Sequence, residues 1–77
     1  MALSFVLMRI KTGSVENVLK QLKKIAEVKE AHAVMGKIDI IAKVEAGDVD
    51  AIAKMVLAKI HKIEGIERTF THIVVPI

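Results

Sequence analysis

The residues with the clearest potential for chemistry lie in the middle of the chain, in the segment Val34–Ile40 (VMGKIDI). Gly36 and Lys37 suit a two-residue hairpin turn, because glycine supplies the positive φ that such turns need. Asp39 follows at once inside an apolar run, where a carboxylate is unfavourable unless it meets water or a cation. The segment is therefore either a plain hairpin with a solvated strand end or a site for a polar ligand.

The other polar side chains give weaker indications of a site. Thr69 and Thr71 alternate onto one face of a predicted strand, which places their hydroxyl groups side by side, although threonine is a common strand residue in any case. His32, His61 and His72 share no ligand spacing, and the chain has no cysteine. The glycines stand apart and form no phosphate-binding motif. No metal, cofactor or catalytic histidine is therefore expected within one chain.

Length and composition set the class of protein. Seventy-seven residues make one small domain, residues 1–77, whose core is marginal unless another subunit covers part of its surface. No stretch approaches the length of a membrane-spanning helix, and the N-terminus lacks the features of a signal peptide, so we expect a cytoplasmic protein. Scarce amide side chains with abundant lysine are a weak indication of a thermophile.

A nucleic-acid partner is not indicated. The net charge is only +3 and aromatic residues make up 3% of the chain, which leaves no set of rings for stacking on single strands. Lys20, Lys23, Lys24 and Lys29 gather near one predicted helix, whose solvated face needs charge whether or not it binds anything. Direct contact with DNA is therefore not expected.

Two copies of one structural unit position these residues. Phe5–Val18 resembles Asp39–Ile52 at an offset of 34 residues, and Leu22–Glu30 resembles Ile60–Arg68 at an offset of 38. Each unit reads as strand, glycine turn, helix, turn and strand, with the second helix about one turn longer than the first. The strands are predicted at residues 3–11, 29–35, 38–46 and 67–75.

Apolar stripes at helical spacing mark the two helices, one beginning at Val15 and the other at Val49. Ser14 and Asp48 are the expected N-caps, and Gly65 is placed to end the second helix. The order βαββαβ predicts an α+β, ferredoxin-like fold, in which both helices cover one face of a four-stranded antiparallel sheet.

The central strands are apolar on both faces, which an isolated domain of this fold does not need. The first strand includes Leu3, Phe5 and Leu7 on one face and Val6 and Met8 on the other. With helices on one side only, the opposite face should alternate to polar residues. We therefore expect a dimer that forms through the sheet.

The whole chain resembles the C-terminal effector domain, or RAM domain, of the Lrp/AsnC (feast/famine) transcription regulators. The resemblance rests on FVLMRIKTG near the start, VKEAHAVMGKIDIIAKV in the middle and IEGIERTFTHIV near the end. The Gly-x-x-Asp turn and the later Arg-Thr-x-Thr segment form a fairly specific pair. The DNA-binding helix-turn-helix of the full-length regulators is missing from these residues, so the chain resembles the stand-alone form of the domain.

The resemblance implies dimers that join through their sheets, rings of such dimers, and free amino acids or related small metabolites bound between dimers. Gly36 would offer backbone amides to the ligand carboxylate, and Asp39 would meet its ammonium group. Met35 and Ile38 stand where the family commonly has a threonine and an aromatic residue, which makes the pocket more apolar than usual. The implied ligand-binding residues are Met35, Gly36, Lys37, Ile38, Asp39, Thr69 and Thr71.

The sequence thus predicts a non-enzymatic module for amino-acid sensing and oligomerisation, which joins or modulates full-length regulators of the same family. Two alternatives stay open. The first is a cofactor-free monooxygenase or isomerase of the dimeric ferredoxin-like type, which needs a polar pocket between the helices and the sheet. The second is a purely structural assembly domain.

Overall fold

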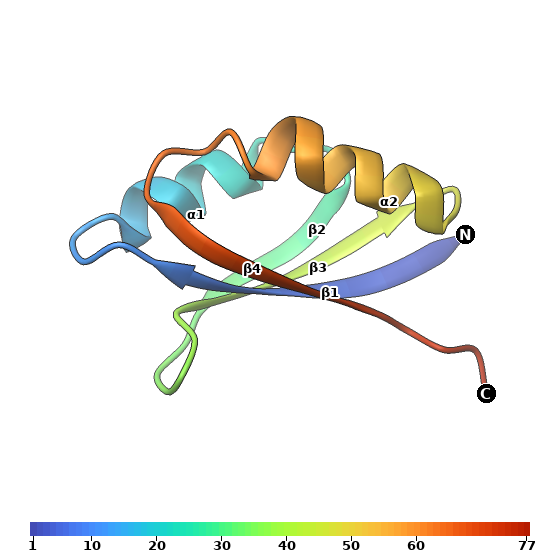
Figure 1. Ribbon diagram of the computed structural model, residues 1–77, viewed down its shortest axis with the longest axis horizontal. Coiled ribbons are helices and arrows are strands. Elements are labelled where there is room, and N and C mark those ends of the chain that lie inside the picture. The colour runs from blue at the N-terminus through green and yellow to red at the C-terminus, as the bar shows by residue number, and fades with distance from the viewer.

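The computed structural model describes all 77 residues, and its elements alternate as strand, helix, strand, strand, helix and strand (Figure 1). The elements are β1 (Ala2–Ile10), α1 (Val15–Lys23), β2 (Val28–Ala33), β3 (Ile40–Ala46), α2 (Val49–Met55) with its continuation η1 (Val56–Ile60), and β4 (Ile66–Ile73). The strands form one antiparallel sheet in the order β2-β3-β1-β4, and both helices lie on one face of it. The predicted ferredoxin-like fold is confirmed.

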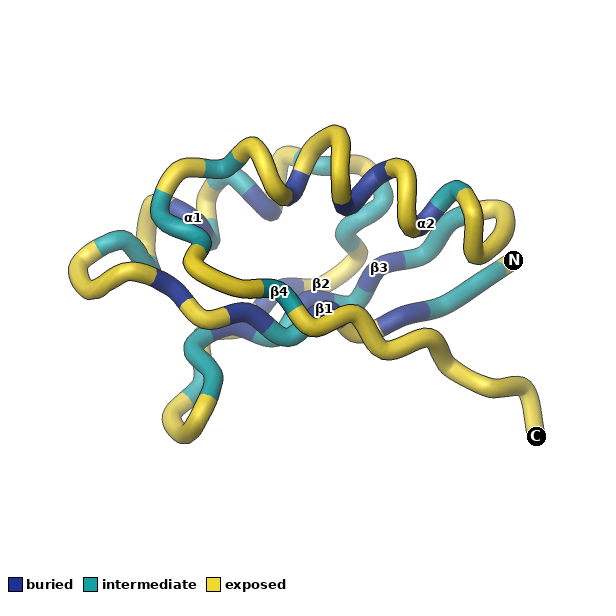
Figure 2. Tube along the Cα trace, viewed as in Figure 1, coloured by how far each residue is buried: buried dark blue, intermediate teal, exposed yellow.

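The core lies between the helix layer and the sheet, where the buried segments of the two layers face each other (Figure 2). Along β1, the buried residues Val6, Met8 and Ile10 alternate with more exposed ones, as expected of a strand with one covered face. Val18 and Leu22 of α1 are fully buried against this face. The alternation fixes which side chains of each strand face the helices and which face away.

The connection between β2 and β3 differs from the predicted two-residue turn. β2 ends at Ala33 and β3 begins at Ile40, and the loop between them is closed by the Val34 N–H, which donates to the Asp39 carbonyl oxygen at 2.9 Å. A tight turn that begins with glycine needs φ near about +60°, whereas Gly36 has φ of +141°. The loop is therefore wider, and more of its backbone is open to solvent.

Ser14 and Asp48 hold the predicted N-cap positions, although only Asp48 caps with its side chain, and the predicted C-cap at Gly65 is wrong. The Asp48 carboxylate accepts a hydrogen bond from the Ala51 N–H at 2.7 Å, as an N-cap should. The Ser14 side chain makes no capping bond. The second helix ends in a π-turn in which the His61 N–H donates to the Val56 carbonyl oxygen at 2.9 Å, so Gly65 lies in the following loop and is not the helix cap.

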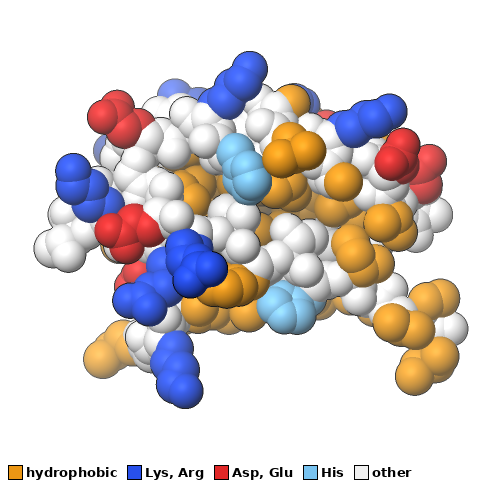
Figure 3. Space-filling view, viewed as in Figure 1, with side chains coloured by type: hydrophobic (Ala, Val, Ile, Leu, Met, Phe, Trp, Pro, Cys, Tyr) orange, Lys and Arg blue, Asp and Glu red, His pale blue; other side chains and the backbone are white.

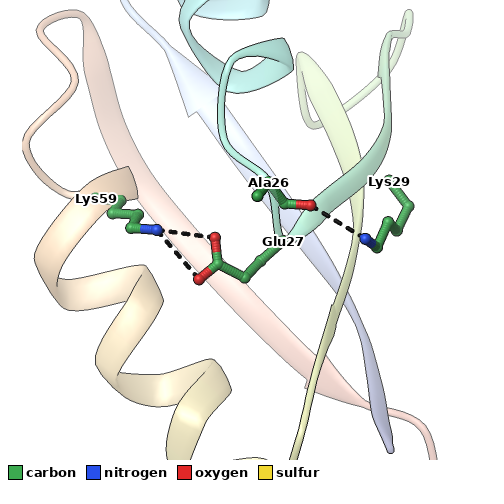
Figure 4. Close-up of polar contacts among 4 residues, drawn as sticks. All are labelled: Ala26, Glu27, Lys29 and Lys59. Carbon is green, nitrogen blue, oxygen red and sulfur yellow. Dashed lines mark hydrogen bonds and ion pairs between the residues drawn. The ribbon is translucent and has the colours of Figure 1, made fainter.

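One ion pair ties the helix layer together across the molecule (Figure 4). Glu27, in the loop between α1 and β2, accepts hydrogen bonds from the Lys59 ammonium of η1 at 2.9 and 3.1 Å. This bond from Lys59 lowers the pKa of Glu27 below its ordinary value of 4.5, with a further contribution from the backbone N–H of Glu27. The pair joins the loop that follows α1 to the end of the second helix.

Candidate functional site

The loop that carries the Gly-x-x-Asp turn projects from the sheet on the side away from the helices (Figure 1). Met35 is fully exposed, and Gly36 and Lys37 are exposed beside it. Ile38 and Asp39 are partly buried where the loop returns to the sheet. The loop therefore presents its backbone amides to solvent while Asp39 sits at its base.

Asp39 is held where the pairing of β1 with β3 stops. Its N–H donates to the Met8 carbonyl oxygen at 2.9 Å, and its Oδ2 accepts a hydrogen bond from the Ile10 N–H at 2.8 Å. The last ladder pair is Met8 with Ile40, so the carboxylate replaces a backbone acceptor for Ile10. The second oxygen, Oδ1, has no partner in the protein. Asp39 thus combines a structural bond with one free anionic acceptor at the loop.

Thr69 and Thr71 lie on the other side of the sheet, the side that the helices cover. They pair with Met8 and Val6, whose side chains are fully buried beneath the helix layer. The Thr69 hydroxyl is 2.9 Å from Nε2 of His61, at the end of the second helix. The two threonines therefore face α2 and η1, as the predicted alternation requires.

A groove of about 410 Å³ separates the second helix from β4. In the space-filling view, hydrophobic side chains gather along it between these two elements (Figure 3). The lining residues are Val49, Ile52, Ala53, Val56, Leu57, His61, Thr69, Thr71 and Ile73. The groove is mostly apolar, with three polar side chains on its wall.

Within one chain, the structure does not bring the two parts of the predicted site together. Thr69 and Thr71 line the groove, whereas residues 35–39 line neither this groove nor any other hollow of the chain. His61 was missed as a neighbour of Thr69, because no local spacing links a helix end to the strand that follows. His61 and Thr69 come into contact only because the second helix lies over β4 in the folded chain.

The other two histidines, His32 and His72, lie on the edge strands β2 and β4. On β2, Nε2 of His32 is 3.1 Å from the carboxylate of Glu30, which also lies 3.7 Å from the Lys43 ammonium. The hydrogen bond from His32, and then the charge of Lys43, lower the pKa of Glu30. Nowhere do three histidine or acidic side chains converge as ligands of a metal ion. This cluster is a solvated network on the sheet.

The face of the sheet opposite the helices is apolar at its centre. Phe5 and Phe70 are each 38% exposed, and Leu7, two residues after Phe5 on β1, pairs with Phe70 of β4. The guanidinium of Arg68 lies 5.5 Å from the centre of the Phe70 ring. Large aromatic side chains are thus left partly uncovered on a face with a charged rim.

The core cluster between the helices and the centre of the sheet is built from apolar side chains. The core cluster contains only hydrophobic residues, and Ser4 is the one buried polar residue, with its hydroxyl unpartnered. No helix in the molecule has the length and apolarity needed to cross a membrane.

Comparison with known sequences identifies the family. Residues 3–76 match the Lrp/AsnC ligand binding domain. An uncharacterized HTH-type transcriptional regulator of Pyrococcus furiosus is 37% identical over 71 residues, which are 88% of this chain and 47% of that protein. The chain therefore spans about half the length of the curated relatives it matches.

Solved structures agree with the sequence match. The crystal structure of FFRP-DM1 is 35% identical with a TM-score of 0.92, covering 97% of this chain and 100% of that one. A protein from Thermus thermophilus is 30% identical with a TM-score of 0.94, covering 100% and 96%. E. coli AsnC is 30% identical with a TM-score of 0.90, covering 99% and 53%. The chain belongs to the family of Lrp/AsnC ligand-binding domains.

Proposed function

We propose that this domain binds a free amino acid, or a related small metabolite, and couples that binding to its assembly. The observation that carries the proposal is the free Oδ1 of Asp39 beside the exposed amides of the Gly36 loop, in a domain of the Lrp/AsnC ligand-binding family. A transcriptional regulator of Neisseria meningitidis with the same fold has been solved as a complex with L-Met, which supports a ligand of this class.

The chemistry of the loop suits an amino-acid zwitterion. Backbone N–H groups at Gly36 can donate to the ligand carboxylate, and Oδ1 of Asp39 can accept from its ammonium group. Hydrogen bonds between charged groups are shorter and about twice as strong as neutral ones. Met35, Lys37 and Ile38 complete the wall of the loop around these two contacts.

A complete site requires two copies of the chain. The Gly36 loop projects on one side of the sheet and Thr69 and Thr71 face the helices on the other, so one ligand contacts both only if they come from different copies. A ligand shared in this way binds the assembly and not its separated parts. Binding therefore shifts the equilibrium towards the assembly by mass action.

The open face of the sheet supplies the first contact between copies. Phe5, Leu7 and Phe70 would be covered by the same face of a second copy, which gives a dimer with the helices outside. Further association of dimers would bring the loop of one towards the groove of the next. Because full-length regulators of the family share this domain fold, the same contacts would let the chain join them.

The experiment is isothermal titration calorimetry of the protein against the free amino acids, with light scattering to follow its mass. We compare the wild type with Asp39→Asn, whose amide oxygen can still accept from Ile10 while the negative charge is lost. We expect heat with at least one amino acid and an affinity at least about tenfold weaker in the variant, because a charge-assisted bond is removed. Equal affinities, or no heat with any amino acid, would overturn the proposal.

A further inference from the structure

Two arginines lie directly opposite each other on the open face of the sheet. Arg9 of β1 pairs with Arg68 of β4, and both residues are exposed. We propose that this pair binds a doubly charged phosphate group, carried by a small phosphorylated metabolite. The inference goes beyond the proposed function, because it assigns a second ligand and does not depend on amino-acid binding.

The register of the strands places both guanidinium groups on one face. Met8 is buried beneath the helices, so its neighbour Arg9 points to the opposite face. Phe70 and its partner Leu7 lie on the open face, and Arg68, two residues before Phe70, faces the same way. Residues directly opposite each other on antiparallel strands have Cβ atoms about 4.5–5.5 Å apart. The two cations therefore share one end of the open face, beside its apolar centre.

No acidic side chain of the chain neutralises the pair. None of the ion pairs in the molecule includes either arginine. Asp39, next to β1 at the start of β3, uses its carboxylate to accept from the Ile10 N–H. Glu67 lies where the register of β1 with β4 shifts, and it forms no ion pair. Like charges directly opposite each other are destabilising, so a bound anion would relieve the repulsion between the two guanidinium groups.

The pair suits a phosphate group better than a carboxylate. The guanidinium of Arg68 lies 5.5 Å from the centre of the Phe70 ring, within the range of a cation–π contact, which orients it before a ligand arrives. One carboxylate offers two oxygens, which a single guanidinium binds in a bidentate manner. A phosphate monoester has a charge of about −1.5 to −2 at pH 7 and three acceptor oxygens, enough for two guanidinium groups.

Other positive charges lie near the same end of the sheet. In the space-filling view, Lys and Arg side chains gather where the loop between β2 and β3 projects (Figure 3). Lys37 is exposed on that loop. The loop leads into β3 at Ile40, which pairs with Met8, next to Arg9. A concentration of one sign of charge attracts an anion before direct contact is made.

The test is calorimetry with inorganic phosphate, glycerol 3-phosphate and acetate at one ionic strength. Both phosphates should bind, and acetate should bind at least about tenfold more weakly because it has one charge and fewer acceptors. Arg9→Gln and Arg68→Gln should each weaken phosphate binding at least about tenfold. Lys20→Gln is the matched control, since it removes the same charge from an exposed position of α1 and should keep the wild-type affinity.

Thermal melts at low salt add a second readout. Phosphate should raise the melting temperature of the wild type by binding to the folded state, and it should not raise that of Arg9→Gln. Without phosphate, Arg9→Gln should melt no lower than the wild type, because a repulsion is removed. A purely structural role for Arg9 would lower the melting temperature in both conditions and would overturn the inference.

The remaining outcomes are distinct from those of the proposed function, which is tested with amino acids. Acetate binding as tightly as phosphate, or equal phosphate affinities of Arg9→Gln and Lys20→Gln, would overturn the phosphate site. Binding of inorganic phosphate without glycerol 3-phosphate would overturn the assignment to a phosphorylated metabolite. If phosphate did not bind but a short DNA duplex did, or if Arg9→Gln lowered only the mass of the assembly, the pair would serve a macromolecular contact and the inference would be wrong.

Discussion

Asp39 serves the fold and the proposed site with different oxygen atoms. Oδ2 binds the Ile10 N–H at 2.8 Å, and Oδ1 is left for a ligand. Removing the carboxylate in Asp39→Ala should lower the free energy of unfolding by about 1–3 kcal/mol, because a partly buried donor loses its acceptor. Asp39→Asn should lower it by less, since the amide oxygen can still accept. Urea denaturation measures both variants. If Asp39→Ala had the same free energy of unfolding as the wild type, the bond to the Ile10 N–H would not stabilise the fold.

Gly65 is required by backbone conformation and by space. Its φ is +103°, and a Cβ added to it would lie 2.7 Å from Cβ of Ser14. Gly65→Ala should therefore lower the free energy of unfolding by about 1–3 kcal/mol. Gly47→Ala is the matched control, because Gly47 has no positive φ and nothing lies within 4 Å of an added Cβ. If thermal melts showed the same loss of stability for Gly65→Ala and Gly47→Ala, the conformation and packing of Gly65 would not be the cause.

At the scale of single residues, the sequence singled out Asp39 but could not show which group it binds. A carboxylate inside an apolar run needs a hydrogen-bond or charge partner, and this need can be seen from the neighbouring residues alone. The bond that satisfies it joins residues 29 positions apart, which no local pattern reveals. The contact of Gly65 with Ser14 is hidden for the same reason, because it depends on how a loop packs against the start of α1.

The two helices differ in how their first turns are capped, which gives a matched pair of variants. Asp48→Ala should lower the free energy of unfolding by about 1 kcal/mol, because the 2.7 Å bond to the Ala51 N–H is lost. Ser14→Ala should change it by only a few tenths of that amount, since the Ser14 hydroxyl makes no capping bond. Chemical denaturation of the two variants decides the matter, and a larger effect at Ser14 would contradict the assignment.

The ion pair between Glu27 and Lys59 should give the stability a small dependence on pH. Because the folded protein holds the pKa of Glu27 below 4.5, the pair stabilises the fold above that pH and ceases to do so as the pH falls through the lowered pKa. Both side chains are partly exposed, so solvent screening limits the effect to less than about 1 kcal/mol.

The variant Lys59→Met isolates this contribution, since it keeps the aliphatic stem and removes the charge. The difference in free energy of unfolding between wild type and Lys59→Met should be present at pH 7 and vanish in acid, well below pH 4.5. Denaturation at a series of pH values measures it. A difference that persisted unchanged in acid would show that packing, and not the ion pair, is responsible.

The elements themselves were predictable to within two residues at each strand end, because the internal repeat and the apolar periodicities agree. The β2–β3 loop and the end of the second helix were not. The loop depends on the φ that Gly36 adopts, +141° and not a tight-turn value. Propensity cannot distinguish the π-turn at Val56–Ile60 from an ordinary helical turn.

The partly uncovered face of the sheet carries the proposed dimer. Placing a charge at its centre in Phe70→Glu should reduce the mass in solution to that of the 8.4 kDa chain, because an unpaired carboxylate is not tolerated in an apolar interface. Ala58→Glu, on the exposed side of the helix layer, should keep the wild-type mass. Analytical ultracentrifugation compares them, and an unchanged mass for Phe70→Glu would place the contact elsewhere.

At the scale of the molecule, the ferredoxin-like fold was predictable and the arrangement of the site was not. The sequence brought the Gly36 loop and the two threonines together only through resemblance to a family. The register of β4 beside β1 places Thr69 and Thr71 beneath the second helix, away from that loop. A single chain therefore holds the two parts of the proposed site apart, and the proposed function depends on their meeting between copies.

The most direct measurement is calorimetry on a mixture of two variants refolded together. Asp39→Asn removes the loop contact. Ala53→Glu places a carboxylate at an exposed position of the groove that Thr69 and Thr71 line, so each variant alone should bind the amino acid that the wild type binds weakly or not at all. In a mixed assembly, an intact loop can meet an intact groove on a neighbouring copy, and we predict that a measurable fraction of the wild-type heat returns. If the wild type binds an amino acid but the mixture gives no more heat than its separate components, the site lies within one copy and the proposed shared site is contradicted.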